Sequence, residues 1–412
     1  MVGRGAKIVL WHTPCGAKTV LFLLPALLGL AAGVAPPVHA EIRQSVRIDA
    51  THALTHLGDG DWGFAGIGRA RLDFLSAGNQ FARGQLRIDA TIVDAAIGDE
   101  SVPAGLLLDI PRAWVRARFP LGESFLHTTA GRARITWGDG AFFNAGDTIF
   151  GAVSRDADLT ADTIRDEARW LWSAFIPLGP FAFIEPILLA PEVRIEADAG
   201  ASSIDAALGA ETPGVWNLSV GGRVQGQIAG IKSEAGYLYR GRELLHTVSA
   251  SAQGHLRLLP GGVGSDLYAS ASTDLPAPGA EESDAAWENL ALSAGALQIH
   301  RLGGDATLSL RLESLWRPAA AWSDRGDPAA VYALTLFPEV IWSPARNASV
   351  FLRSIVSPID GSAMIIPGGS WNIFQDFTMS LFAFVAAGES SDVFHPNRPG
   401  GATVQTTFSF VY

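Results

Sequence analysis

The sequence predicts an all-β protein, a transmembrane antiparallel β-barrel of about 18 strands. Apolar and polar residues alternate with a period of two in many short segments, as in strands that face lipid on one side and a wet lumen on the other. The mean hydropathy is positive, yet no long apolar segment follows residue 40. The chain also ends in alternating aromatics, Phe408, Phe410 and Tyr412, as the last strand of such a barrel does.

Residues 1–40 have the pattern of a secretory signal peptide. Arg4, Lys7 and Lys18 form a basic leader, residues 20–34 are nearly all apolar, and residues 38–40 offer a small-x-small cleavage site. The alternative is a membrane anchor, but this apolar stretch is shorter than the roughly 20 residues that a spanning helix needs. The expected domains are therefore a signal peptide over 1–40 and a barrel over 41–412.

Composition excludes several classes of protein. Cys15 is the only cysteine, so the exported chain has no internal disulfide and no cysteine-built metal site. Residues 1–40 hold three basic and no acidic residues, which leaves 27 Lys+Arg against 41 Asp+Glu and a formal charge of −14. An acidic chain without a basic run argues against nucleic acid as a partner.

The alternation is clearest in 216–228, 246–258 and 306–316. In the last of these, Leu308 and Leu310 share one face, and Arg311 lies on the other. Each segment has at least the 9–11 residues, approximately, that a tilted strand needs to cross a bilayer. The same pattern predicts strands at 42–54, 63–75, 81–94, 106–119, 125–137, 168–176, 180–190, 215–228, 231–241, 245–258, 264–274, 287–300, 305–316, 331–343, 347–357, 362–373, 377–387 and 402–412.

The connections alternate between tight turns and long loops. Turns such as 120–123 and 375–376 are short, whereas the segments 138–167, 191–214, 275–287, 317–329 and 388–401 are long and acidic or rich in Pro, Ala and Gly. Short periplasmic turns and long external loops produce this asymmetry, and an even strand count places both ends in the periplasm. The weakest predicted strands are 106–119, 231–241 and 362–373, so 16 strands remain an alternative.

Charged residues within the strands are expected to face the lumen, because Arg or Lys facing lipid at the midplane costs roughly 2–4 kcal/mol. Arginines recur at short, even spacing in the first five predicted strands, with carboxylates among them. One interpretation is a salt-bridge network that stiffens the wall, and the other is a charged constriction that selects solutes by sign. The candidates for this role are Arg69, Arg71, Arg87, Arg116, Arg118, Arg132, Arg134, Asp73 and Asp89.

One segment, 131–147, carries a motif that goes beyond strand pattern. It resembles the strand-to-loop motif G-R-Q-x-I-x-W-G-x-G-x-x-x-N-P-x-D of outer-membrane barrels of the alginate-export and carbohydrate-porin types. Ala133 and Ala145 depart from that pattern, and the matching positions are Arg132, Ile135, Trp137, Gly138, Gly140, Asn144 and Asp147. The glycines would let the chain turn inward and narrow the lumen. Trp137 is expected in the interfacial belt, where an amphipathic ring is favoured.

The terminal aromatics Phe408, Phe410 and Tyr412 resemble the signal that the barrel-assembly machinery reads in bacterial outer-membrane proteins. The chain is therefore expected in a Gram-negative outer membrane, in contact with lipid and lipopolysaccharide. The leading hypothesis is a passive channel for small hydrophilic solutes, anionic or sugar-like. The alternatives are a structural or surface-interaction barrel with a closed lumen, and an outer-membrane hydrolase.

Chemistry beyond transport has little support in the sequence. Residues 156–167 space their oxygens like a calcium-binding EF-hand loop, but Ala161 stands where the sharp turn requires glycine. The histidines are scattered, and no G-x-S-x-G or Gly-rich phosphate loop occurs. We therefore expect no catalytic residues, no metal and no cofactor.

Overall fold

The structure, a computed structural model, describes residues 41–56, 62–76, 78, 81–97, 100–154, 157–191, 217–257, 263–276, 286–320, 333–396 and 401–412. Residues 1–40 lie outside these ranges, so the signal peptide remains a prediction. In the described part of the chain, no helix is long and apolar enough to cross a membrane.

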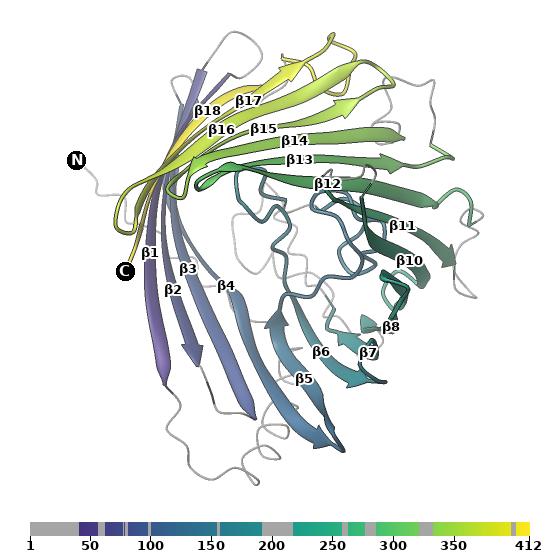
Figure 1. Ribbon diagram of the computed structural model, residues 1–412. Coiled ribbons are helices and arrows are strands. Elements are labelled where there is room, and N and C mark those ends of the chain that lie inside the picture. Colours follow the sequence, from purple (N-terminus) through teal and green to yellow (C-terminus); the bar gives the residue numbers. More distant parts are fainter. Residues whose placement is uncertain are drawn as a thin grey trace.

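The described chain forms one antiparallel sheet of 18 strands (Figure 1). The strands are β1 (Ile42–His56), β2 (Trp62–Ser76), β3 (Ala82–Ile97), β4 (Glu100–Leu121), β5 (Ser124–Ala133), β6 (Arg169–Pro177), β7 (Ala182–Leu189), β8 (Ser219–Ile228), β9 (Ile231–Arg240), β10 (Leu245–Leu256), β11 (Ser265–Pro276), β12 (Ala291–Gly303), β13 (Ala306–Trp316), β14 (Leu334–Ala345), β15 (Ala348–Ser357), β16 (Ser362–Phe374), β17 (Phe377–Ala387) and β18 (Ala402–Val411). The predicted count of 18 is confirmed, and the alternative of 16 is wrong.

The sheet closes on itself, because each strand pairs with its neighbours in sequence and β18 pairs with β1. The last residue completes this seam: Val46 and Tyr412 exchange two backbone hydrogen bonds, at 2.8 and 2.7 Å. Closure leaves no sheet edge, which is the condition for a β-sheet to sit in hydrocarbon.

The two faces of the wall follow from the register. Ile48 and Leu72 are exposed apolar side chains on the outer face. The intervening side chains of these strands, such as Arg47 and Arg71, form a cross-strand pair on the inner face. The wall is therefore apolar outside and charged inside, which is the arrangement of a barrel that spans a membrane.

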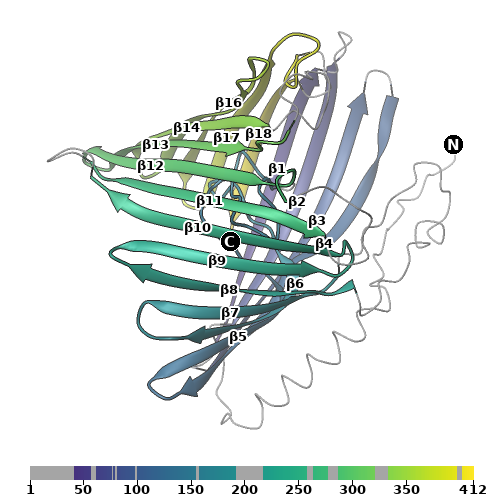
Figure 2. The same cartoon turned by 90° about the vertical axis from the view of Figure 1, so that its right-hand side faces the viewer.

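The connections separate into two rims. Turns of two to four residues, at 122–123, 178–181, 229–230, 304–305, 346–347 and 375–376, lie at the rim that also holds the start of β1 and the end of β18. The strand ends that the long connections 317–333 and 388–401 join, such as Trp316 and Ala387, lie at the opposite rim (Figures 1 and 2). Most connections follow the predicted asymmetry, but 98–99, 241–244 and 358–361 of the second rim are also short, and 257–264 of the first rim is longer.

The connection from β5 to β6, residues 134–168, runs inside the barrel (Figure 1). We call it the inward loop. The predicted strand over 125–137 is too long, because β5 ends at Ala133 and the chain then leaves the wall. The expectation that the glycines of this segment let the chain turn into the lumen is confirmed.

The buried core of the molecule lies between the inward loop and the inner wall. One cluster joins Ile135, Trp137 and Ile149 of the loop to four apolar residues of β6, β7 and β9, namely Leu171, Ile187, Leu189 and Leu238. A second cluster joins the loop to β12, β13, β14 and β15 through Phe142, Phe143, Ile164, Ala291, Leu315, Phe337 and Ile355. Two separate apolar anchors thus seat the loop on the wall.

Candidate functional site

The inward loop has its own internal scaffold. Gly138 and Gly140 adopt φ angles of 67° and 146°, where a side chain would be strained. The Asn144 amide donates to the Trp137 carbonyl at 2.8 Å, and its oxygen accepts the Gly146 N–H at 3.1 Å. Asp147 accepts the N–H groups of the next turn at 3.1 and 3.2 Å. The residues of the sequence motif therefore fold the loop.

Burial changes the chemistry of Asp147. It raises the pKa of this carboxyl to about 6, and the charge of Arg165, 3.1 Å away, opposes that rise only in part. Arg165 also lies 3.6 Å from Glu167, which accepts a hydrogen bond from the Ser154 hydroxyl. These three charged groups tie the middle of the loop to its end.

A wall carboxylate, Glu313 of β13, anchors the tip of the inward loop. Its oxygens accept the consecutive N–H groups of Ala141, Phe142 and Phe143 at 2.7, 2.9 and 2.8 Å. The Tyr268 hydroxyl donates to the same carboxylate at 2.5 Å. Glu313 is fully buried, so these bonds replace the hydration that it loses.

Further ion pairs and hydrogen bonds hold the loop around its length. Arg353 of β15 donates to the Leu159 and Ala161 carbonyls at 2.5 and 2.9 Å. Lys232 of β9 binds Asp139 at 2.7 Å, and Arg223 of β8 donates to the Thr136 carbonyl at 3.0 Å. The loop is thus a fixed partition of the lumen, attached to the walls on several sides.

Trp137 does not lie in the interfacial belt, so that expectation is wrong. Its side chain is fully buried inside the barrel, and the Arg223 guanidinium lies 5.9 Å from its ring. A Cβ on Gly236 of β9 would come within 3.2 Å of the same ring. The physical reason is that β5 ends four residues earlier, so the ring follows the loop inward.

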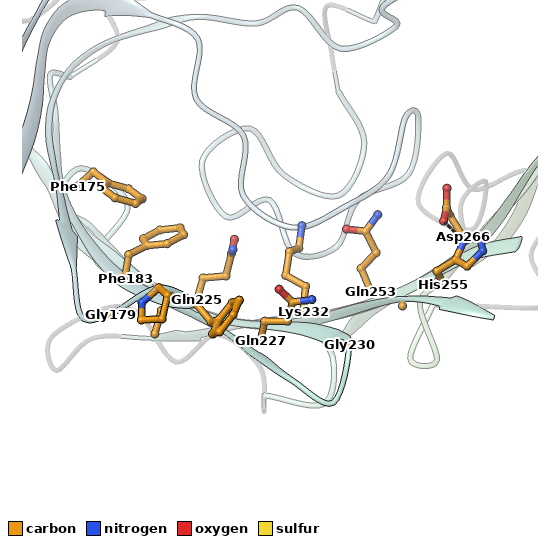
Figure 3. Close-up of a pocket in the computed structure, with 14 residues that line it drawn as sticks. Phe175, Gly179, Phe183, Gln225, Gln227, Gly230, Lys232, Gln253, His255 and Asp266 are labelled. Atoms are coloured by element: carbon orange, nitrogen blue, oxygen red, sulfur yellow. Dashed lines mark hydrogen bonds and ion pairs between the residues drawn. The ribbon is translucent and has the colours of Figure 1, made fainter. Parts of the chain in front are cut away.

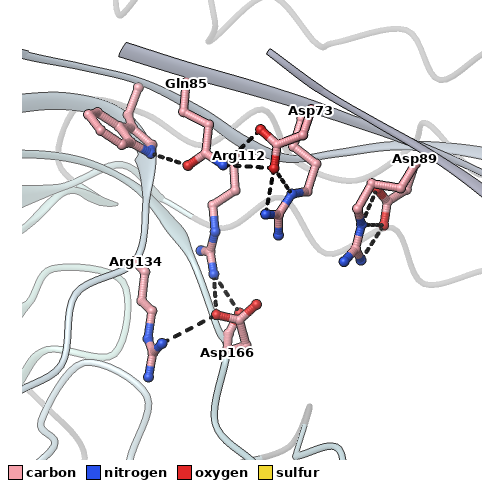
Figure 4. A network of polar contacts seen from close by, with 9 residues as sticks. Asp73, Gln85, Asp89, Arg112, Arg134 and Asp166 are labelled. Atoms are coloured by element: carbon pink, nitrogen blue, oxygen red, sulfur yellow. Dashed lines mark hydrogen bonds and ion pairs between the residues drawn. The ribbon is translucent and has the colours of Figure 1, made fainter. Parts of the chain in front are cut away.

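Opposite the loop's main anchors, the inner faces of β1 to β5 form what we call the arginine wall. Part of it is neutralised by carboxylates (Figure 4). Arg71 binds Asp89 at 2.8 Å, and Arg87 binds Asp73 at 2.7 Å. Both pairs bridge β2 and β3 and are largely buried. The interpretation as a stiffening salt-bridge network therefore fits this half of the wall.

The other half of the arginine wall lacks such partners. Among the residues that the structure describes, no carboxylate lies within salt-bridge distance of Arg69, Arg83, Arg116 or Arg118. Arg83 and Arg116 stand directly opposite each other on β3 and β4. Arg116 donates to the Thr129 hydroxyl at 3.1 Å, and Arg118 lies 4.4 Å from the Phe125 ring. Like charges opposed in this way repel, and an anion between them would be stabilised.

The two-residue spacing of Arg132 and Arg134 suggested that both side chains lie on the same face of a strand. In the structure they do not. Arg132 pairs in register with Trp170, an exposed residue of the outer face, and it binds Asp109 at 2.9 Å. This differs from the expectation that Arg132 faces the lumen. Arg134 follows the end of β5 and lies inside, 3.6 Å from Asp166 of the loop.

The arginine wall and the loop line an open cavity of about 330 Å³. Its charged lining consists of Arg87, Arg112, Arg116, Arg134 and Asp166. Asp166 binds Arg112 at 2.5 Å, and Gln85 accepts the Trp114 indole N–H at 3.1 Å (Figure 4). Arg87 is already paired with Asp73, so the other three guanidinium groups against Asp166 give this cavity its excess of positive charge.

Sequence reasoning missed Arg112, which is buried at the junction of wall and loop. The signal was present, because Arg112, Arg116 and Arg118 have even spacing and share one strand face. Pro111 and the weak alternation before it made the predicted strand 106–119 one of the weakest, and Arg112 was not singled out within it. The Glu185–Arg223–Glu234 network, with separations of 2.8 and 2.9 Å, was also missed because its partners lie on three different strands.

The described residues of 156–167, whose spacing resembles an EF-hand loop, form hydrogen bonds and ion pairs within the protein. Asp156 lies outside the described residues. Asp158 accepts the Thr160 N–H at 2.9 Å, and Glu167 binds Ser154 and Arg165. Within the described ranges, no group of three or more His, Cys, Asp or Glu residues is arranged to hold a metal ion.

The predicted assembly residues lie at the seam of the barrel. Phe408 and Phe410 belong to β18, are exposed on the outer face, and pair in register with Ala50 and Ile48 of β1. Tyr412 extends past the strand and is 87% exposed. An outward aromatic row at the closing strand is what a terminal recognition signal requires, and its recognition remains a prediction.

Comparison with known proteins identifies structures of the same architecture. No protein-family model and no curated protein matches this sequence. Among solved structures, OccAB4 of Acinetobacter baumannii has a TM-score of 0.51 at 8% identity and covers 92% of this chain and 100% of its own. OccK7 (OpdD) of Pseudomonas aeruginosa has a TM-score of 0.52 at 10% identity, with 91% and 99% covered. OccK5 (OpdH) of the same species has a TM-score of 0.52 at 8% identity, and the match covers 90% of this chain and 98% of its own.

These solved structures are outer-membrane porins. At such low identity the likeness concerns the fold, which extends over nearly the whole of each chain. The protein is thus an 18-stranded antiparallel barrel of porin architecture, with a charged inner wall and a loop fixed in its lumen.

Proposed function

We propose that the protein is an outer-membrane channel that lets small hydrophilic solutes diffuse passively and that favours anions. The observation that carries this proposal is the unneutralised half of the arginine wall, beside a lumen that the loop narrows. Arg69, Arg83 and Arg118 are exposed on the inner face although they have no carboxylate partner in the described structure. A structural role alone gives no reason to keep guanidinium groups unpaired in this way.

The sign preference follows from local charge. The exported chain is acidic overall, but a solute in the lumen meets the nearest side chains first, within a Debye length of about 8 Å at physiological ionic strength. Around the cavity at Arg112 these side chains are mainly arginines. Their planar forks bind two oxygens of a carboxylate or phosphate at once, so such groups are the expected ligands.

The setting of the channel is part of the same proposal. The porin fold and the outward aromatic residues of β18 support a location in a Gram-negative outer membrane, with lipid and lipopolysaccharide around the barrel and assembly by the barrel-assembly machinery. The resemblance of segment 131–147 to the alginate-export and carbohydrate-porin motif supports the same class of protein. In this setting the channel is not an enzyme.

The test is ion selectivity in planar bilayers under a salt gradient. Replacing Arg83, Arg116 and Arg118 together by Ser should shift the reversal potential toward that of cations. The shift should shrink at 1 M salt, where the screening length is about 3 Å. Arg132→Ser is the matched control, because its side chain lies on the outer face and should leave the reversal potential unchanged.

Two results would contradict the proposal. Silence of the correctly folded wild-type barrel would favour the alternative of a structural barrel whose loop closes the lumen. An unaltered reversal potential in the triple variant, with normal conductance, would show that these arginines do not set selectivity.

A further inference from the structure

A second cavity, of about 420 Å³, lies on the inner face of β6 to β11 near the rim of short turns (Figure 3). It contains none of the arginines of the arginine wall. Its lining is instead largely aromatic and amide, with Phe175, Phe183, Gln225, Gln227, Lys232 and Gln253. Its chemistry therefore differs from that of the anion-favouring side of the lumen.

The aromatic part is a paired platform. The rings of Phe175 and Phe183 lie 4.4 Å apart at 34° and project into the lumen from β6 and β7. Both are only partly buried, although their neighbours along the inner wall are polar. The His127 ring stacks on Phe175 at 5.8 Å, and the Arg223 guanidinium lies 5.3 Å from the Phe183 ring. The parts of the two rings that remain exposed to the lumen provide contact area for the C–H surface of a ring-shaped solute.

The polar part is a row of free amides. Gln225 lies beside Phe183 in register, and Gln253 lies beside Lys232. No hydrogen bond to the side-chain amides of Gln225, Gln227 or Gln253 is found among the described residues. Each primary amide can donate and accept at once, as a hydroxyl group can. Several amides next to an aromatic face therefore match a ring that carries many hydroxyl groups.

The inward loop contacts one residue of this cavity's lining. Lys232 points from the floor to the loop, where it binds Asp139 at 2.7 Å (Figure 3). The charge of this lysine is thereby neutralised, so the cavity does not depend on an anionic ligand. On its far side, His255 and Asp266 bind each other at 2.8 Å. Within the described lining, the three amides are thus the polar side chains left to meet a ligand.

We propose that this cavity is a binding site for a small saccharide on its way through the channel. The saccharide ring packs on Phe175 and Phe183, and its hydroxyl groups bond to Gln225, Gln227 and Gln253. An apolar or simple aromatic solute would leave these amides unpaired, which lowers its affinity. The inference rests on the proposed channel only for the route by which the sugar arrives.

The test uses maltotriose, a neutral sugar, and isothermal titration calorimetry of the full exported barrel in detergent. The wild type should bind the sugar. The double variants Gln225→Ala/Gln253→Ala and Phe175→Ala/Phe183→Ala should each bind about tenfold more weakly, because two hydrogen bonds or an aromatic platform are lost. Gln405→Ala, an inward amide on β18, is the control and should bind like the wild type.

Channel recordings separate this inference from the proposed function. Maltotriose should interrupt the single-channel current of the wild type, and the amide variant should need more sugar for the same effect, with its conductance in plain salt unchanged. Binding without any conductance would overturn the channel and leave the sugar site standing. Conductance without sugar binding would overturn the site alone. Tighter binding of benzoate than of maltotriose, lost only in the phenylalanine variant, would also overturn it.

Discussion

One buried residue of the inward loop, Asp147, makes several of the contacts that hold the loop together. Asp147 is almost completely buried, accepts two backbone N–H groups and faces Arg165. Its pKa of about 6 lies well above the value of 3.8 for an exposed aspartate. The folded protein therefore holds this proton more tightly than the unfolded chain does.

The pH dependence of stability follows from this difference. Between about pH 4 and pH 6 the native state binds the extra proton, so the contribution of Asp147 to stability falls as pH rises and is lowest above pH 6. Asp147→Asn cannot titrate and keeps an acceptor oxygen. The stability of the wild type relative to this variant should be greater at pH 5 than at pH 7.5, by on the order of 1–2 kcal/mol. Melting of the heat-modifiable gel band measures it, and an equal difference at both pH values would contradict the raised pKa.

Residue orientation was the hardest property to predict from the sequence. Alternation correctly indicates which side chains share a face within a strand, as for Arg69 and Arg71. It fails where a strand ends, because the end of β5 depends on contacts that the loop makes with β9 and β13, far away in the chain. Trp137 was misplaced for this reason, whereas Arg132 lies within β5 and was assigned to the wrong face of the strand.

At the scale of elements, the strands were predictable and the seating of the inward loop was not. Each strand has a local signal of period two, and even the doubtful segments 231–241 and 362–373 correspond to β9 and β16. The sequence motif indicated that the loop turns inward. Its resting place depends on Glu313, Arg353 and Lys232, whose partners are mostly loop backbone groups or distant carboxylates that leave no pattern in the sequence.

The attachment of the loop by Glu313 can be tested directly. Glu313→Ala leaves three backbone N–H groups without an acceptor, and each buried unpaired group costs about 1–3 kcal/mol. The loop tip should detach, and single-channel conductance should rise with larger current noise. Glu313→Gln, which keeps one acceptor oxygen, should have a smaller effect.

Asp305→Ala provides the comparison, because this aspartate forms an exposed pair with Arg346 at the rim of short turns. Its conductance should match that of the wild type. If Glu313→Ala conducts like the wild type and folds normally, the loop is held without this carboxylate.

The whole molecule depends on joining the two ends of the described chain. β18 meets β1 over ten residue pairs, and the backbone of Tyr412 adds the final hydrogen bonds to Val46. Replacing Phe410 and Tyr412 by Asp should block insertion, because charged groups would then face lipid at the closing strand. Loss of the heat-modifiable band in outer-membrane fractions, with periplasmic aggregates, is the expected result. Gln405→Ala, on the inner face of the same strand, should assemble normally.

Because the loop is fixed to one side of the lumen, the two sides of the passage differ in charge. Exposed carboxylates, Asp158 and Asp162, lie on the part of the loop that Arg353 of β15 holds, whereas the arginines without a described carboxylate partner lie on β2 to β4. Opposite charges on different sides create a transverse electric field. A solute with separated charges turns in such a field and passes in a preferred orientation. The barrel would therefore distinguish zwitterions by the size of their dipole moment, even when their net charge and volume are equal.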